Sequence, residues 1–438
     1  MSDLPVEPIA IGFKWRSSKW FILSTVTIAL FGETFLYGFI IPILGYMVQS
    51  RLKIDPDQAQ RLTSAVLALH GAVSVVAGPI IGHFADRTPN RKIPLLLSVL
   101  SCIIGTIMIA GTHSVTILLL GRVLQGVATS AVWIVSLATI ADMVGQQNLG
   151  AIMGLTMSFV NLGTIGGPAA SGLLLEAVGY WVTWLIPLLI LAVDLVARLV
   201  MIECPKKDSS TPTAEAGEAG ETASLLSATY PPVARNFWRI MLSDARVLTV
   251  LLVVISGATV GTSFAATLPI HVQETFGWGP RRTGLAFSCL VIPAIIIAPL
   301  AGWVRDRVGS RPPAVISLVL QAGFLGLLGV AGSDRITWAR ANHQGGTVYV
   351  ACILALSALR PFMSCIGPVE LSAAVKAHQE KSPGIFGSEG GLSRVFSMME
   401  VAASLGMTIG PIVSGLLKEN LGYACMSWTL SKSYPVFM

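Results

Sequence analysis

The sequence predicts an all-α polytopic membrane protein. Of its 438 residues 53% are hydrophobic and only 12% are charged, and its mean hydropathy is +0.72, whereas a soluble globular protein carries about 25% charged residues. Apolar runs of about 20 residues, long enough to cross a bilayer core, recur between charged clusters and Gly/Pro turns. This composition excludes a water-soluble enzyme. Orientation signals explain the net charge of +6 more simply than a nucleic-acid partner does.

The predicted spans form two groups separated by a polar connector. The tract over 204–246 cannot bury enough surface to fold alone and is interpreted as a linker, although its end, 234–247, fits a short helix in the membrane interface. We therefore expect an N-terminal six-helix bundle over 1–203, a linker over 204–246 and a C-terminal bundle over 247–438. The apolar segments lie near 20–48, 62–84, 93–112, 116–142, 150–177 and 180–202, and near 247–270, 283–304, 313–332, 346–369 and 394–417.

Charge sets the orientation, and the end of the sequence limits the last helix. Lys and Arg are more frequent in the segments on the side of the N-terminus and linker, which places both in the cytoplasm. After Gly422 only about ten apolar residues remain, interrupted by Lys432 and Pro435, too few to cross a core of about 30 Å. The twelfth helix is therefore predicted to be incomplete, as a shortened helix or the product of an altered transcript.

A charged loop motif occurs once in each group of helices. The second copy follows the first by 220 residues, at the equivalent point after the second span of its group. Its glycine permits tight packing, its aspartate can cap or pair at a helix end, and its arginines fix a cytoplasmic turn. Two matched copies indicate two six-helix halves repeated in parallel, a recognised plan of transporters. The motif residues are Gly82, Asp86, Arg87 and Arg91, and Gly302, Asp306, Arg307 and Arg311.

Two further motifs lie inside predicted helices. The fourth span contains Arg122 followed by Gln125-Gly126, and a charge within the membrane usually faces a partner or a cavity. It is either functional or part of a structural ion pair. The fifth span carries spaced glycines that permit close helix approach, and a proline that bends the helix. These residues are Gly154, Gly163, Gly167, Pro168 and Gly172.

Together these motifs resemble those of the major facilitator superfamily over essentially the whole chain. The loops resemble its G-x-x-x-D-R-x-G-R-R/K signature, although Pro89 and Asn90 depart from it, and Arg122 fits its R-x-x-Q-G motif. The fifth span matches the antiporter motif G-x8-G-x3-G-P-x2-G-G except at Ser171. The resemblance implies that the loops latch the two halves, that Arg122 takes part in proton transfer, and that the protein exports its substrate.

Two acidic residues lie within predicted spans, Glu33 in the first and Glu400 in the eleventh. Hydrocarbon solvates a charged carboxylate poorly, so such groups can load and release protons as access alternates. Pro42 and Pro411 follow them by nine and eleven residues, a pattern resembling vesicular amine transporters and fungal drug and secondary-metabolite exporters. In those amine transporters a second-helix lysine pairs with the eleventh-helix acid. His70 stands at that position here, so we predict a titratable pair of His70 and Glu400.

Other polar and aromatic residues complete the predicted sites. Asp194 and Arg198 are spaced to neutralise one another within the sixth span. Arg360 either lines the cavity or meets a carboxylate across the halves. Candidate substrate-binding residues are Tyr37, Trp133, Phe264 and Arg360, and the proton-coupling candidates are Glu33, His70, Arg122 and Glu400.

The residues and the resemblance together predict a proton-coupled exporter of small amphipathic molecules. It would work by alternating access, as a monomer, in the plasma membrane rather than the vacuole, driven by the proton gradient without cofactor or metal. The segment 381–387 is similar to one in fungal members. The alternatives are an uptake symporter or facilitator, or a nontransporting sensor or degenerate paralogue. An enzyme is not expected, because no nucleophile-base motif, metal cluster or nucleotide loop is present.

Overall fold

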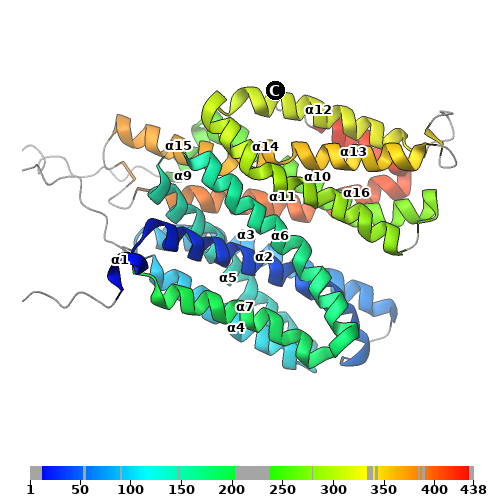
Figure 1. Ribbon diagram of the computed structural model, residues 1–438, viewed down its shortest axis with the longest axis horizontal. Helices are drawn as coiled ribbons and strands as arrows, with labels where there is room; N and C mark the ends of the chain where they lie inside the picture. The colour runs from blue at the N-terminus through cyan, green and yellow to red at the C-terminus, as the bar shows by residue number, and fades with distance from the viewer. Residues whose placement is uncertain are drawn as a thin grey trace, which may run out of the picture.

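The computed structural model consists of helices throughout the part of the chain that it describes (Figure 1). That part includes eleven helices long and apolar enough to cross a membrane, so the prediction of an all-α membrane fold is confirmed. Residues 203–236, which include most of the predicted linker, and the motif positions 89–90 lie outside it. The described residues are 12–52, 56–88, 91–145, 148–202, 237–278, 280–332, 339–340, 344–382, 385–386 and 390–433.

The N-terminal half begins with a short helix and continues with six long ones. Ser18 starts the first long helix by accepting a hydrogen bond from the backbone N–H of Phe21 at 3.2 Å, the usual role of an N-cap serine. The helices are α1 (Phe13–Arg16), α2 (Lys19–Ser50), α3 (Pro56–Ala85), α4 (Lys92–Gly111), α5 (Val115–Val144), α6 (Leu149–Val178) and α7 (Tyr180–Val200).

The C-terminal half contains more interrupted helices. Its tenth span is divided where Pro361 follows Arg360, since proline cannot donate the backbone hydrogen bond that continues a helix. The helices are α9 (Phe237–Ser243), α10 (Ala245–Phe276), α11 (Pro280–Val308), α12 (Arg311–Val330), α13 (Gly345–Leu359), α14 (Pro361–Ser364), α15 (Ile366–Lys381) and α16 (Leu392–Ser433).

Gly422 divides α16 into a long and a short segment. Its φ of 84° and ψ of 166° are not helical, a conformation that glycine adopts without steric cost. The segment after it, 423–433, is roughly 16 Å long at the helical rise of 1.5 Å per residue. This described segment is shorter than the thickness of a bilayer core.

The two halves lie side by side and meet along two pairs of helices. Figure 1 shows α2 to α7 grouped in one bundle, in blue to green, and α10 to α16 in the other. Helix α6 packs against α11, and α3 packs against α16. Small residues allow this approach, because a Cβ at Gly302 would lie only 2.0 Å from the carbonyl oxygen of Gly150. The halves are therefore in direct backbone contact at the ends of the helices that carry the repeated loops.

The predicted interfacial helix falls partly on described residues. Helix α9 lies within the expected range 234–247, and its Phe237 and Met241 are buried. The ring of Phe237 packs against the guanidinium of Arg394, with 4.5 Å between ring centroid and Cζ. The end of the linker is thus attached to the start of α16.

Candidate transport site and its latches

Asp86 of the first loop motif binds the start of a helix in the opposite half. Its Oδ1 accepts a hydrogen bond from the Ser393 N–H at 2.8 Å, and its Oδ2 accepts from the backbone N–H of Arg394 at 3.2 Å and its Nε at 2.8 Å. The first N–H groups of a helix lack partners within the helix and carry partial positive charge, which a carboxylate stabilises. Asp86 therefore caps α16 across the interface between halves.

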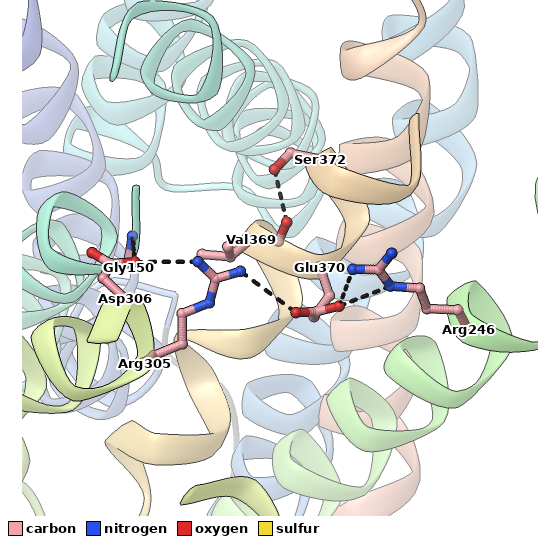
Figure 2. Close-up of polar contacts among 7 residues, drawn as sticks. All are labelled: Gly150, Arg246, Arg305, Asp306, Val369, Glu370 and Ser372. Carbon is pink, nitrogen blue, oxygen red and sulfur yellow. Dashed lines mark hydrogen bonds and ion pairs between the residues drawn. The ribbon is translucent and has the colours of Figure 1, made fainter. Parts of the chain in front are cut away.

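Asp306 of the second loop motif makes the reciprocal contact. Its carboxylate accepts from the backbone N–H of Gly150 at 2.9 Å, as Figure 2 shows. It also accepts from the backbone N–H of Ala151 at 2.8 Å, and both residues lie in the first turn of α6. Asn148, the residue at the cap position of α6, makes no capping hydrogen bond with its own side chain. Each half thus supplies the aspartate that caps a helix of the other, and we call these two contacts the latches.

A network of charges supports the second latch. Arg305 Nη1 lies 3.2 Å from Asp306 Oδ1, and its Nη2 lies 3.5 Å from Glu370 Oε1. Glu370 also accepts a hydrogen bond from Arg246 Nε at 2.8 Å, as Figure 2 shows. In the same helix the Ser372 hydroxyl donates to the carbonyl oxygen of Val369. The network links α10, α11 and α15. The charge network of Arg246, Arg305 and Glu370 was not predicted from the sequence.

The remaining loop residues lie around the latches without entering them. Arg91 pairs with Asp142 of its own half at 2.5 Å. Arg87 and Arg311 are exposed, and Arg307 lies over the ring of Trp303 at 4.9 Å. A Cβ at Gly82 would lie 2.6 Å from Ser397 Cβ, so that glycine permits α3 to approach α16.

The fifth-span glycines contact two different helices. Added Cβ atoms at Gly163 and Gly167 would lie 2.6 and 2.2 Å from backbone oxygens of α2, whereas one at Gly154 would lie 2.3 Å from the Ala298 oxygen of α11. Pro168 packs against Gly38 of α2, and Gly172 has no neighbour within 4 Å of such an atom. The motif thus joins α6 to α2 within one half and to α11 across the interface.

Glu33 lies at the centre of a polar cluster within the N-terminal half. Thr129 of α5 donates to its Oε1, and the Cys102 thiol of α4 lies 3.7 Å from its Oε2. His70 Nε2 of α3 lies 3.2 Å from Thr129 Oγ1. Four helices therefore converge on one buried carboxylate, and three of them contribute side chains that can exchange or orient a proton.

Arg122 is fully buried beside this cluster. Its Nη1 donates to Gln125 Oε1 at 2.9 Å and its Nε to the Val66 carbonyl at 3.4 Å. Both acceptors are neutral, and among the described residues Nη2 has no hydrogen-bond partner. The charge of Arg122 instead acts at longer range on Glu33 and His70.

Glu400 approaches the cluster from the other half. It is 8% exposed on α16 and lies close enough to Glu33 for the two charges to interact. The described residues provide it with no hydrogen bond or ion pair, and its predicted direct pairing with His70 is not formed in this conformation. His70 is linked to Glu33 instead, through Thr129.

The predicted substrate-binding residues do not form one group. The ring of Tyr37 lies 5.2 Å from His70, and Trp133 packs on the core shared by the two halves. Phe264 is buried within the core of the C-terminal half. Arg360 is exposed, and its guanidinium lies beside Gly261 of α10. Tyr37 is therefore the candidate that the structure brings to the predicted proton-coupling residue His70.

The predicted pair in the sixth span is confirmed. Arg198 Nη2 lies 2.5 Å from Asp194 Oδ2, and Nε donates to Oδ1 at 2.8 Å. Arg198 also donates to Ser98 Oγ at 3.0 Å. Both charged groups are buried, so their role is to bind α7 to α4.

Comparison with known proteins gives the class. Residues 26–388 match the family model of the Major Facilitator Superfamily, and the chain belongs to that superfamily. It is similar to an uncharacterized MFS-type transporter of Schizosaccharomyces pombe, with 30% identity over 428 residues and 94% of each chain covered. The chain is therefore an integral membrane transporter with a small-molecule substrate.

More distant relatives have named activities. The class C tetracycline resistance protein of Escherichia coli is 25% identical over 303 residues, with 69% of this chain and 70% of that one covered. A probable vesicular acetylcholine transporter of Danio rerio is 22% identical over 419 residues, with 92% and 74% covered. The human organic anion transporter MFSD10 has the same fold, with a TM-score of 0.71 at 16% identity over 95% of this chain and 98% of that one. The resemblance inferred from the motifs is thereby confirmed.

Proposed function

We propose that this transporter exports small amphipathic molecules, such as drugs or secondary metabolites, in exchange for protons. The observation that carries the proposal is a buried carboxylate in each half, Glu33 on α2 and Glu400 on α16, with α16 packed against α3 and α5, the helices that supply His70 and Thr129 to the Glu33 cluster. Two negative charges close together in a poorly solvated site disfavour one another. Protonation of one, or arrival of a substrate that compensates the charge, relieves the repulsion, so the two events can compete for one site.

The latches provide the conformational change that this mechanism requires. In the described conformation both are formed, so the cytoplasmic ends of the helices are joined. Protons then reach Glu33 and Glu400 from the outside, substrate is released to the outside, and opening of the latches delivers the protons to the cytoplasm. Each cycle returns the carboxylates to the charged state that favours binding of the next substrate.

Two further observations support export. The fifth-span glycines, which fit an antiporter motif, lie between α6 and its partners α2 and α11. One relative is a tetracycline resistance protein. We further propose that the protein acts as a monomer, because the site and both latches are built within one chain, and that it resides in the plasma membrane.

The test is transport of fluorescent lipophilic compounds into inside-out vesicles under a pH gradient. We expect accumulation that a protonophore abolishes, and loss of accumulation in Glu33→Gln and in Glu400→Gln. Glu176→Gln removes an exposed carboxylate near the end of α6 and serves as the matched control, with transport unchanged. Accumulation that persists in both site variants would contradict the coupling role. Accumulation driven by the opposite gradient would indicate uptake.

A further inference from the structure

Thr129 occupies a position between two titratable residues that do not touch one another. Its hydroxyl oxygen contacts Glu33 Oε1, lies 3.2 Å from His70 Nε2 and lies 2.9 Å from the Gln125 carbonyl oxygen one turn earlier in α5. The three side chains belong to α2, α3 and α5, and all three are buried. Thr129 is thus the hydroxyl through which these helices communicate.

The hydrogen count of a hydroxyl restricts how these contacts coexist. Threonine has one O–H donor and two acceptor lone pairs. When Thr129 donates to a charged Glu33, the contact with His70 requires that Nε2 carries the hydrogen and donates to Thr129. When Glu33 is protonated and donates to Thr129, the threonine hydrogen can point at the Gln125 carbonyl oxygen or at Nε2, and the second orientation completes the chain to His70. The chain Glu33–Thr129–His70 therefore has two directions, and they differ by the position of one proton.

We propose that the Thr129 hydroxyl relays a proton between Glu33 and His70, an inference that rests on the proton coupling proposed above. In the inward step the O–H bond of the Glu33 carboxylic acid breaks and its proton bonds to Thr129 Oγ1. At the same time the Thr129 O–H bond breaks and that proton bonds to His70 Nε2. Glu33 is left as a carboxylate, Thr129 is again a hydroxyl, and His70 is an imidazolium, so atoms and charge balance.

The charged surroundings of His70 make its imidazolium a short-lived intermediate. Arg122 on α5 disfavours an imidazolium, whereas the carboxylate left on Glu33 favours it. Around Glu33 itself lie the Cys102 thiol on α4, Arg198 on α7 and Glu400 on α16, and Tyr37 on α2 lies beside His70. A neutral His70 that accepts at Nε2 carries its hydrogen on Nδ1, which is buried without a hydrogen-bond partner. That N–H is costly, so it is the Nδ1 proton that leaves after the transfer, which returns a neutral imidazole with its hydrogen on Nε2. A proton on His70 must therefore move on.

The location of His70 gives the proton an exit. It lies on α3, which packs against α16 of the other half, and a Cβ on the next residue, Gly71, would lie 3.6 Å from Thr408 Oγ1. Separation of the halves during alternating access parts these two helices. The relay thus connects a carboxylate enclosed by the N-terminal bundle to the surface that the transport cycle opens.

The test compares two substitutions of Thr129 in the purified full-length protein. Thr129→Val keeps the β-branched shape and removes the hydroxyl, whereas Thr129→Ser keeps the hydroxyl. Time-resolved infrared absorption after a pH jump follows the C=O band of the protonated carboxylic acid, and the Glu33 band is the one that Glu33→Gln removes. We expect Thr129→Val to slow the response of this band at least about tenfold, a modest share of what a positioned proton-transfer group contributes. Thr129→Ser should keep the wild-type rate.

His70→Ala provides a second arm that does not depend on the folding of the valine variant. His70→Ala should slow the change in absorbance of the Glu33 band as much as Thr129→Val does. The double variant should respond no more slowly than either single variant, because both substitutions interrupt one proton route. A hydroxyl with a merely structural role would shift the midpoint pH of the band without slowing it. A wild-type rate in Thr129→Val or His70→Ala, with a Glu33 band that titrates, would overturn the relay alone. A Glu33 band that does not respond to pH would overturn both the relay and the proposed coupling.

Discussion

Asp86 and Ser393 join the two halves of the transporter, with 2.8 Å between the carboxylate oxygen and the amide nitrogen across 307 residues of sequence. Asp306 and Gly150 repeat the arrangement in the opposite sense at 2.9 Å. A repeated sequence motif has therefore produced a reciprocal contact. Each copy acts on the half to which it does not belong.

We expect Asp86→Asn to favour opening of the latch. Hydrogen bonds to a charged group contribute about 1.5–3 kcal/mol, and 1.4 kcal/mol corresponds to a factor of about ten in an equilibrium. The measurement is alkylation of the thiol introduced by Ser397→Cys, a buried position facing Gly82, read by peptide mass spectrometry. Its rate should rise about tenfold. Asp142→Asn, which removes an acid paired within one half, should leave the rate unchanged. Equal rates in all forms would show that Asp86 does not hold the halves together.

Gly154→Ala should separate α6 from α11. The added Cβ would lie 2.3 Å from the Ala298 carbonyl oxygen, a backbone atom that cannot rotate away, and overpacking of this kind costs about 1–3 kcal/mol. Thermal unfolding in detergent, followed by tryptophan fluorescence, should show a lower Tm. Gly172→Ala on the same helix is the control, since nothing lies within 4 Å of its added atom. A similar Tm loss in both variants would mean that helix flexibility, not close packing, is the cause.

The buried pair Asp194–Arg198 should show strong coupling. Removing one partner leaves an uncompensated charge, and we expect Asp194→Leu or Arg198→Met to destabilise the protein by about 3–5 kcal/mol. The double substitution Asp194→Leu/Arg198→Met should recover most of that loss, because no charge then remains buried. Chemical denaturation in micelles measures the free energy of unfolding of the wild type, the two single variants and the double variant. Losses that simply add would indicate that the two residues act independently.

The pair Asp244–His378 should contribute a pH-dependent term to stability. Partial burial raises the pKa of Asp244, but the hydrogen bond from His378 and those from the backbone N–H groups at the start of α10 outweigh it, so that the pKa lies below its usual value. A lowered native pKa gives stability that is present above the unfolded pKa of about 3.9 and is lost as the pH falls through the native value.

The corresponding comparison is the Tm of wild-type protein and Asp244→Asn against pH. The wild type should be the more stable form near neutral pH, and its advantage should shrink below about pH 4. Asparagine keeps an acceptor for the Arg246 N–H, so the helix cap is retained. An advantage that grows on acidification would reverse the sign and refute the assignment.

Hydropathy was sufficient to predict the helices, because spans of 20 or more apolar residues are required by bilayer thickness. The pair Asp194–Arg198 was predictable because an i,i+4 spacing brings both side chains to one helix face. These features are local in sequence, because each depends only on residues within a single helix.

Contacts between helices were not derivable in this way. The partner of His70 was predicted to be Glu400, by position in a motif, but the side chain hydrogen bonds to Thr129, whose place among the apolar residues of α5 carries no distinctive pattern. Glu370 was likewise not assigned to its network, because Arg246 lies 124 residues away. A polar residue on an otherwise apolar helix was the available signal, and it does not specify which neighbour the residue meets.

The contact between Phe237 and Arg394 couples α9, at the end of the predicted linker, to the latch formed by Asp86. Arg394 holds Asp86 with its Nε while its guanidinium lies against the Phe237 ring. Motion of α9 away from α16 must either break the cation–π contact or displace the arginine from the aspartate. Movement of α9 is therefore coupled through Arg394 to Asp86, and so to the contact that joins the two halves.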